Sequence, residues 1–197
     1  GMQGESGDVV VVKGKTVVPE EKKVYLAFNK PRGIVCTAEK REKNNVIDYL
    51  SYPVRIYPVG RLDKDSEGLL LMTNDGAIVN GIMRARNRHE KEYQVEVNKE
   101  ITPEFLKKMA SGVPILDTVT RPCRIRKTGE RSFTIILTQG LNRQIRRMCE
   151  ALGYRVTKLK RVRIMNIHLK DLKTGEYRPL TEKELAELKK QIGEEKR

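Results

Sequence analysis

The chain has 197 residues, of which 34% are charged and 38% hydrophobic, a composition typical of a polar globular protein with one main core. Its 40 Lys and Arg residues outnumber its 26 Asp and Glu residues, so the net charge of +14 favours a polyanionic partner, above all nucleic acid. No apolar run approaches the roughly 20 residues that a transmembrane helix needs, and the N-terminus has no signal-peptide pattern, so we expect a cytoplasmic protein without membrane contact.

The first half of the chain predicts short strands and helices separated by turns. Residues 9–18, VVVVKGKTVV, are strand-like on both sides of a Gly turn. Residues 24–28 predict an apolar strand, which the turn KPRG joins to a second strand at 34–37 in a hairpin. The next three elements are a short helix, a buried strand and a longer helix, at 45–50, 69–73 and 77–87.

The second half combines strands with well-delimited helices. The helix at 102–112 has Pro103 in its first turn and a glycine at its end, and the helix at 142–153 begins at an Asn and ends at a Gly. The helix at 181–192 begins with a capping box. Four further strands are expected, at 93–97, 123–127, 133–138 and 154–164. Because strands and helices do not alternate regularly, the fold class is predicted to be α+β, with a mixed, mainly antiparallel sheet and flanking helices.

The stretch RLDKDSEG at 61–68 places three acids at alternate positions. Asp63, Asp65 and Glu67, followed by a glycine, match the first half of an EF-hand calcium loop. The twelfth position of such a loop requires a bidentate Glu, whereas here it is Asn74, and the flanking segments are not helical. The cysteines and histidines also lack metal-ligand spacing, so we expect no metal site. Local sequence leaves two alternatives, a charged surface turn and an active site.

Four stretches together resemble the pseudouridine synthases that modify ribosomal RNA. They are NKPRG, VGRLDKDSEGLLLMTNDG, KEYQVEV and QGLNRQIRRMCEALGY, at residues 29–33, 59–76, 91–97 and 139–154. The resemblance covers residues 22–185, and the most similar branch is that of the small-subunit rRNA enzyme and its large-subunit relatives, with a large-subunit member favoured. It implies a pseudouridine synthase fold with two lobes around a basic cleft. It also implies a reaction without cofactor or metal, in which the N1–C1′ bond of a uridine is broken and C5 is joined to C1′.

The resemblance assigns three catalytic residues. Asp63 matches the essential aspartate, whose carboxylate can act as a nucleophile toward the sugar or as a base near it, and both routes stay open. Tyr93 matches the active-site tyrosine, although without the resemblance cross-strand packing would be the preferred interpretation of this residue. Arg146 matches the basic residue that pairs with the aspartate and keeps it ionised. A buried stripe on the helix at 142–153 leaves its arginines on another side, near the helix start, where phosphate is attracted.

The target base must leave the RNA stack to enter a pocket, and Arg61 is expected to occupy the space left behind. The other expected contributors to RNA binding are Leu62, Lys64, Arg143, Gln144, Arg147, Lys30 and Arg32. Leu159 is assigned to the pocket wall. The basic strand is expected to add contacts to the RNA backbone through Lys158, Lys160, Arg161 and Arg163. Asp65 and Glu67 are expected to point away from the RNA and to pair within their own loop.

Relatives in this family carry a small S4-type RNA-binding module before the catalytic domain. Residues 1–21 are therefore interpreted as a remnant or linker after such a module, and residues 22–192 as the catalytic domain. The expected partner is RNA, with rRNA first and a tRNA as a second candidate, and the protein is expected to be a monomer. The alternative function is a non-catalytic RNA-binding or ribosome-assembly protein on the same fold.

Overall fold

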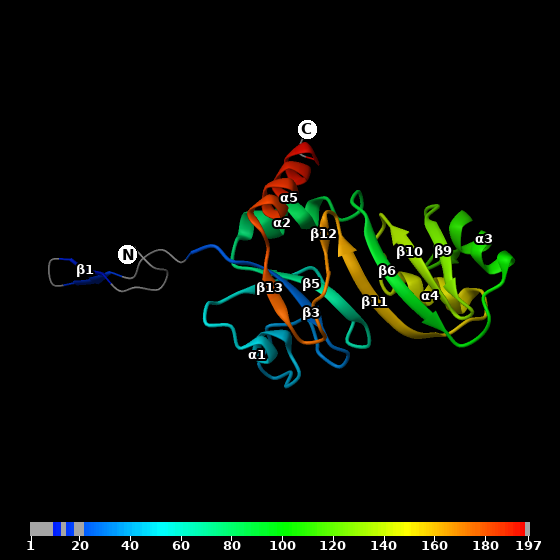
Figure 1. The fold of residues 1–197 in the computed structure, drawn as a ribbon, viewed down its shortest axis with the longest axis horizontal. Coiled ribbons are helices and arrows are strands. Elements are labelled where there is room, and N and C mark those ends of the chain that lie inside the picture. The colour runs from blue at the N-terminus through cyan, green and yellow to red at the C-terminus, as the bar shows by residue number, and fades with distance from the viewer. Residues whose placement is uncertain (1–9, 13–14, 18–21, 196–197) are drawn as a thin grey trace.

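The computed structural model describes residues 10–12, 15–17 and 22–195, and it arranges residues 22–195 in two lobes along one continuous sheet (Figure 1). The strands of this sheet run, from one edge to the other, in the order β13 (Tyr177–Pro179), β3 (Tyr25–Lys30), β5 (Glu67–Thr73), β11 (Val156–Ile164), β6 (Lys91–Val97), β10 (Ser132–Leu137) and β9 (Arg124–Gly129). Two short strands complete it, β4 (Tyr57–Val59) beside β5 and β12 (Ile167–His168) beside β11. The pair of β5 with β11 is parallel, and the other pairs are antiparallel. The predicted α+β class with a mainly antiparallel sheet is confirmed.

The first lobe is built on β3 and β5, which are buried on both faces. Alternate residues of each strand enter two separate apolar clusters, because successive side chains of a strand point to opposite faces. Helices α2 (Gly76–Arg84) and α5 (Glu182–Glu195) cover one face through Ile82 and Leu188, among others. The short helix α1 (Val46–Leu50) packs on the other face through Val46. Burial on both faces explains why residues 69–73 form an uninterrupted apolar run.

The second lobe consists of β6, β10 and β9 with two helices on one face (Figure 1). Helix α3 (Pro103–Ser111) begins at Thr102, whose hydroxyl accepts from the backbone of Phe105, as its capping sequence predicts. Helix α4 (Gln144–Ala151) carries a buried stripe against the strands, and a small hairpin of β7 (Pro114–Ile115) and β8 (Thr118–Val119) lies at the rim. The lobe therefore holds its own core, separate from that of the first lobe.

Strand β11 joins the two lobes at the centre of the sheet. It pairs with β5 of the first lobe in parallel and with β6 of the second lobe in antiparallel register. The parallel contact requires Gly68, because a Cβ there would lie 2.2 Å from the carbonyl oxygen of Arg161, and the φ of Gly68 is +111°. The two lobes are thus fixed relative to each other by shared backbone hydrogen bonds.

Two expectations about the N-terminal half have different outcomes. Residues 34–37 do not form a hairpin with β3: Val35 makes an isolated bridge with Asn45, because β5 and β13 already occupy both edges of β3. The strands expected within residues 9–18 are present as β1 (Val10–Val12) and β2 (Lys15–Val17), which pair with each other. The expected S4-type remnant stays a prediction, since residues 1–9, 13–14 and 18–21 lie outside the described part of the chain.

Candidate active site between the lobes

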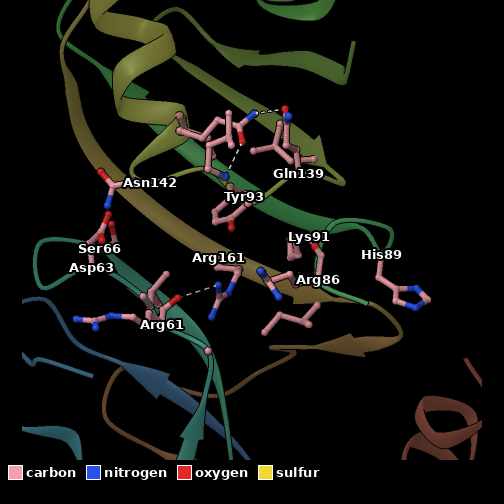
Figure 2. Close-up of a pocket in the computed structure, with 18 of the residues that line it drawn as sticks. Arg61, Asp63, Ser66, Arg86, His89, Lys91, Tyr93, Gln139, Asn142 and Arg161 are labelled. Atoms are coloured by element: carbon pink, nitrogen blue, oxygen red, sulfur yellow. Dashed lines mark hydrogen bonds between the residues drawn. The ribbon is translucent and has the colours of Figure 1, made fainter. Parts of the chain in front are cut away.

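A pocket of about 390 Å³ lies where the two lobes meet around β11 (Figure 2). Its lining comes mainly from four segments, namely the segment after β4, β6, β11, and the loop and first turn of α4, and in addition from the end of α2 and the turn after it. The resemblance named residues on all four of these segments, and the fold brings them together. The polar and charged side chains of the lining include Arg61, Asp63, Ser66, Arg86, Lys91, Tyr93, Gln139, Asn142, Arg143 and Arg161.

Asp63 stands in a tight turn at the wall of this pocket. Its carbonyl oxygen accepts from the backbone N–H of Ser66 at 3.0 Å, which closes the turn just before β5. Its side chain is 35% exposed, and its carboxylate lies 3.3 Å from a guanidinium nitrogen of Arg143. The carboxylate is therefore open to a ligand in the pocket and is held by one cation from the other lobe.

Arg143 holds both acids of the turn. Its two terminal nitrogens donate to the two carboxylate oxygens of Asp65 at 3.0 and 2.9 Å, a bidentate pair, while one of them also reaches Asp63. Arg143 is the N-cap residue of α4, with left-handed backbone (φ 49°), so its side chain leaves the helix start toward the turn. The hydrogen bonds from Arg143 lower the pKa of Asp65, and the same bonds raise the pKa of Arg143.

The expected pair of Asp63 with Arg146 is wrong in this structure. Arg146 lies one turn further along α4, where its side chain reaches the far side of the turn instead. It donates to the carbonyl oxygen of Asp65 and to the hydroxyl of Ser66, both at 3.0 Å, and its ion pair with the Asp65 carboxylate measures 3.6 Å. Burial lowers the pKa of Arg146, while the charges of Asp65 and Asp63 act to raise it. Arg146 therefore positions the turn that carries Asp63.

The expected role of Asp65 also needs correction. Its partners are not in its own loop but on α4, where Arg143 and Arg146 both contact its carboxylate. These contacts occupy the acid and join the first lobe to the start of α4. An EF-hand, which the sequence already argued against, is contradicted here too, because the loop lies between β4 and β5 rather than between helices. Within residues 10–12, 15–17 and 22–195, no group of three or more His, Cys, Asp or Glu side chains could hold a metal ion.

Tyr93 and Leu159 form an apolar part of the pocket. Tyr93 lies on β6 opposite Arg161 of β11, and its ring packs against the core of the second lobe. Figure 2 shows its hydroxyl turned toward Arg161. Leu159, which the resemblance placed in the pocket wall, lines the pocket and is buried. A flat base would meet a ring face and an aliphatic side chain at this place.

Four residues expected to contact RNA are available for it. Arg61 lines the pocket mouth and is exposed, and Figure 2 shows its guanidinium pointing away from Arg161. Lys64 and Arg32 are exposed, while Arg147 is half-buried and donates to Asn142. Their contact with RNA stays a prediction.

Other residues expected to contact RNA are instead buried within the protein. Lys30 is 0% exposed, and its ammonium donates to the carbonyl oxygens of Pro31 and Ile34 at 2.8 Å, so its expected RNA contact is wrong. Gln144 is buried and its amide holds the loop before α4. Leu62 is buried in the core of the first lobe. Gln144 and Leu62 both line the pocket.

The basic strand β11 is likewise less available than its sequence indicates. Arg163 is paired with Glu90 and Glu92 at 3.0 Å each, and Arg161 is buried. The expected backbone contacts therefore fall on Lys158 and Lys160, which remain accessible. Sequence alone counts four cations here, but the alternation of a strand places Lys158 and Lys160 on one face and Arg161, with Leu159, on the other.

Several residues that line the pocket were not assigned there from the sequence, and two of them, Arg161 and Lys91, are charged and lie on the sheet. Arg161 was assigned to the RNA backbone, and Lys91 was given no role. Lys91 lies two residues before Tyr93 on the same strand, which puts both side chains on one face of the sheet. That spacing was the available signal for Lys91. For Arg161 the signal was its place two residues after Leu159 on β11.

Comparison with known proteins places this geometry in a family. A family model described as RNA pseudouridylate synthase matches residues 24–151, more than half of the chain. The chain belongs to the RNA pseudouridylate synthase family. The predicted family, fold and isomerase class are thereby confirmed.

Several relatives of this pseudouridylate synthase are close. The Salmonella typhi protein named dual-specificity RNA pseudouridine synthase RluF is 54% identical over 194 residues, covering 98% of this chain and 67% of the relative. The Bacillus subtilis protein named ribosomal large subunit pseudouridine synthase B is 35% identical and aligns over 96% of this chain and 80% of its own length. A crystal structure described as a pseudouridylate synthase superposes with a TM-score of 0.79 at 29% identity, over 88% of this chain and 76% of that one.

No helix of the described residues is long and apolar enough to span a membrane.

Proposed function

We propose that this pseudouridylate synthase converts a uridine of large-subunit rRNA to pseudouridine in the pocket between its lobes, with Asp63 as the reacting carboxylate. The observation that carries the proposal is an aspartate at the wall of a pocket, open to a ligand and held by Arg143. The names of the relatives, which include a ribosomal large-subunit enzyme, support the choice of RNA. Location in the cytoplasm, action as a monomer and a tRNA as second substrate stay predictions.

The chemistry needs a carboxylate beside the sugar of the target nucleotide. The N1–C1′ bond breaks with its electron pair on N1, so the uracil departs as an anion. Asp63 either forms a bond from its oxygen to C1′ or accepts the proton from C2′. After the uracil has turned, C5 bonds to C1′ while the bond from Asp63 to C1′ breaks or, on the second route, while C2′ regains its proton from Asp63. C5 then loses its proton, and N1 gains one. Tyr93 and Leu159 supply flat apolar surface that holds the base during the turn.

The uridine reaches Asp63 by leaving the RNA stack, a step that costs a few kcal/mol. Arg61 stands at the pocket mouth with an exposed guanidinium and is placed to contact the RNA outside the pocket. Lys64, Arg32 and Arg147 add positive charge around it. Their attraction to phosphate weakens as salt concentration rises.

The deciding experiment compares wild type with Asp63→Asn on rRNA prepared without the modification. Wild type should form pseudouridine, and the variant should lose about 10³-fold or more in single-turnover rate, since a positioned acid or base contributes about 10²–10⁴-fold. The thermal midpoint should change little, because the 3.3 Å ion pair of Asp63 is partly solvated and contributes less than about 1 kcal/mol. Asp171→Asn, at an exposed aspartate, is the matched control.

Two results would refute the proposal. A wild-type protein that forms no pseudouridine in any rRNA would favour the alternative, a non-catalytic RNA-binding or ribosome-assembly protein. An Asp63→Asn variant with full activity would show that Asp63 is not the reacting carboxylate. Mapping pseudouridine in rRNA from cells with and without the gene identifies the uridine.

A further inference from the structure

Arg161 is a buried cation that the protein does not neutralise. It is 7% exposed, and its Nε donates to the carbonyl oxygen of Leu69 at 2.9 Å, while one terminal nitrogen reaches the carbonyl oxygen of Arg61 at 3.5 Å (Figure 2). Within the described part of the chain no carboxylate lies within ion-pair distance of it. A buried charge without a counter-charge is unfavourable. Lys30 is also buried among backbone oxygens, but Arg161 differs because it lines the pocket, where a ligand can neutralise it.

Three other buried or half-buried arginines of this chain are neutralised by acids, unlike Arg161. Arg146 contacts Asp65, Arg163 contacts Glu90 and Glu92, and Arg178 contacts Glu184. The hydrogen bonds of Arg161 instead go only to backbone oxygens. A guanidinium has five N–H donors, and the two bonds above leave the remaining donors without an acceptor among the described residues. The second terminal nitrogen is not enclosed by protein, and the residue lines the pocket.

A second cation stands on the same face of the sheet. Lys91 is two residues from Tyr93 on β6, and Tyr93 is directly opposite Arg161 on β11, so all three side chains project together. The ammonium of Lys91 donates to the carbonyl oxygens of Arg86 and Thr138, which holds it in the pocket lining with a third N–H left over. Burial, and then the charges of Arg161 and Arg121, lower the pKa of Lys91 to about 8.

We propose that Arg161 and Lys91 bind the carbonyl oxygens of the target uracil and stabilise the anion that forms when the N1–C1′ bond breaks. This inference rests on the proposed function. The electron pair of the broken bond goes to N1 and spreads over the ring to O2 and O4, so negative charge develops on oxygens that these donors can reach. Because both routes open to Asp63 release the same anion, the assignment does not depend on the choice between them.

The arrangement also separates the opposite charges of the site. Asp63 and its partner Arg143 belong to the turn and to the start of α4, whereas Arg161 and Lys91 belong to the sheet beneath Tyr93. A donor fixed by backbone contacts needs no reorganisation when charge appears on the base, which is the condition for electrostatic catalysis. Donors directed at the uracil oxygens also distinguish uracil from cytosine, whose amino group would be repelled.

The test uses single-turnover rates at saturating RNA, with RNA affinity measured separately across salt concentrations. Arg161→Met should lose about 10²–10³-fold in rate, the effect of removing one such donor, and Lys91→Met should lose about 10-fold. Neither should change the slope of log affinity against log salt, because a contact with the base releases no counterion from phosphate. Arg126→Met, at an exposed arginine of β9 outside the pocket, is the control.

The pH dependence of the rate, which Lys91 controls, is a second measurement. It remains informative even if Arg161→Met does not fold. The charged and titratable groups around it are Arg161 on β11, Arg121 before β9, Tyr93 on its own strand, and Arg86 and His89 in the preceding turn. Lys91 is protonated below its folded pKa, so the wild-type rate should be highest below about pH 8 and fall above it. Lys91→Arg, which stays charged, should keep its rate at higher pH, and Lys91→Met should lose the alkaline fall.

Three outcomes overturn the inference while leaving the proposed function intact. One is an active wild type with both Met variants as fast as wild type. Another is a salt slope reduced by about one with an unchanged saturated rate, which would make Arg161 a phosphate ligand. The third is an alkaline fall that persists in Lys91→Met and Lys91→Arg. A wild type without activity would instead reject the proposed function itself.

Discussion

The two walls of the pocket treat charge in opposite ways. On one wall, Asp63 meets the guanidinium group of Arg143, which together with Arg146 also holds the neighbouring Asp65 across the lobes. On the other wall, Arg161 and Lys91 face the cavity with backbone oxygens as their hydrogen-bond partners. The first wall is balanced within the protein and keeps a carboxylate in place. The second is incomplete without a ligand that brings negative charge.

The largest effect is expected where the two walls are joined. In Gly68→Ala the new Cβ would lie 2.2 Å from the Arg161 carbonyl oxygen, at a φ of +111°, so β5 and β11 must separate. We expect a loss of about 3 kcal/mol or more in the free energy of unfolding, measured by urea titration. Gly76→Ala, where a Cβ meets nothing within 4 Å, is the matched control and should be nearly neutral. Equal stabilities for the two variants would contradict the proposed close contact.

Removing the cation that both acids share should disturb the balanced wall most. In Arg143→Met, Asp63 loses its ion-pair partner and Asp65 keeps only Arg146. We expect the single-turnover rate to fall about 10²-fold, the size of a misplaced reacting group, with a small change in thermal midpoint. Arg155→Met, at an exposed arginine after α4, should keep the wild-type rate. If both variants react equally fast, Arg143 does not orient Asp63.

Asp65→Asn should have a smaller effect of the same kind. The Asn keeps the size of the side chain but removes the charge that Arg143 and Arg146 contact, and we expect about a 10-fold lower rate. Since the folded pKa of Asp65 is lowered, its stabilisation is present above its unfolded pKa, about 4, and is lost as pH falls through the folded value. Wild type should exceed the variant in stability by less than about 1 kcal/mol at pH 7, because the pair is partly exposed. A gap that persists at the lowest pH would show that another contact is responsible.

The smallest effects are expected at the pocket surroundings. Arg32→Ala and Lys64→Ala remove exposed cations, so each should weaken RNA binding only a few-fold and lower the salt slope by about one if it contacts a phosphate. The rate at saturating RNA should not change. Filter binding at several salt concentrations measures both quantities. An unchanged slope would place the RNA path elsewhere.

Much of this fold could be predicted because local signals were strong. The capping residues of α3 and α5 and the apolar run of β5 predicted those elements directly, and the motif residues predicted which segments meet at the pocket. The failures concern partners. Helix periodicity put Arg143 and Arg146 on one side of α4, but the choice between two aspartates depends on reach across the lobes. Lys30 looked like a surface cation, and only its three-dimensional surroundings show that backbone oxygens bury it.

The central position of β11 has a consequence for how the enzyme folds. The hydrogen bond from Arg161 to Leu69 joins residues that are 92 positions apart, and the parallel pair β5–β11 depends on the same long closure. Contacts so distant in sequence form slowly, because the intervening chain must be ordered first. The first lobe is itself closed by contacts that are more distant still, since β13 pairs with β3 and Leu188 packs with Ile82, whereas the core of the second lobe lies between Val95 and Leu159. The second lobe can therefore become compact first. The first lobe and the pocket need the last part of the chain, so a newly made chain should acquire activity only after that part has been added.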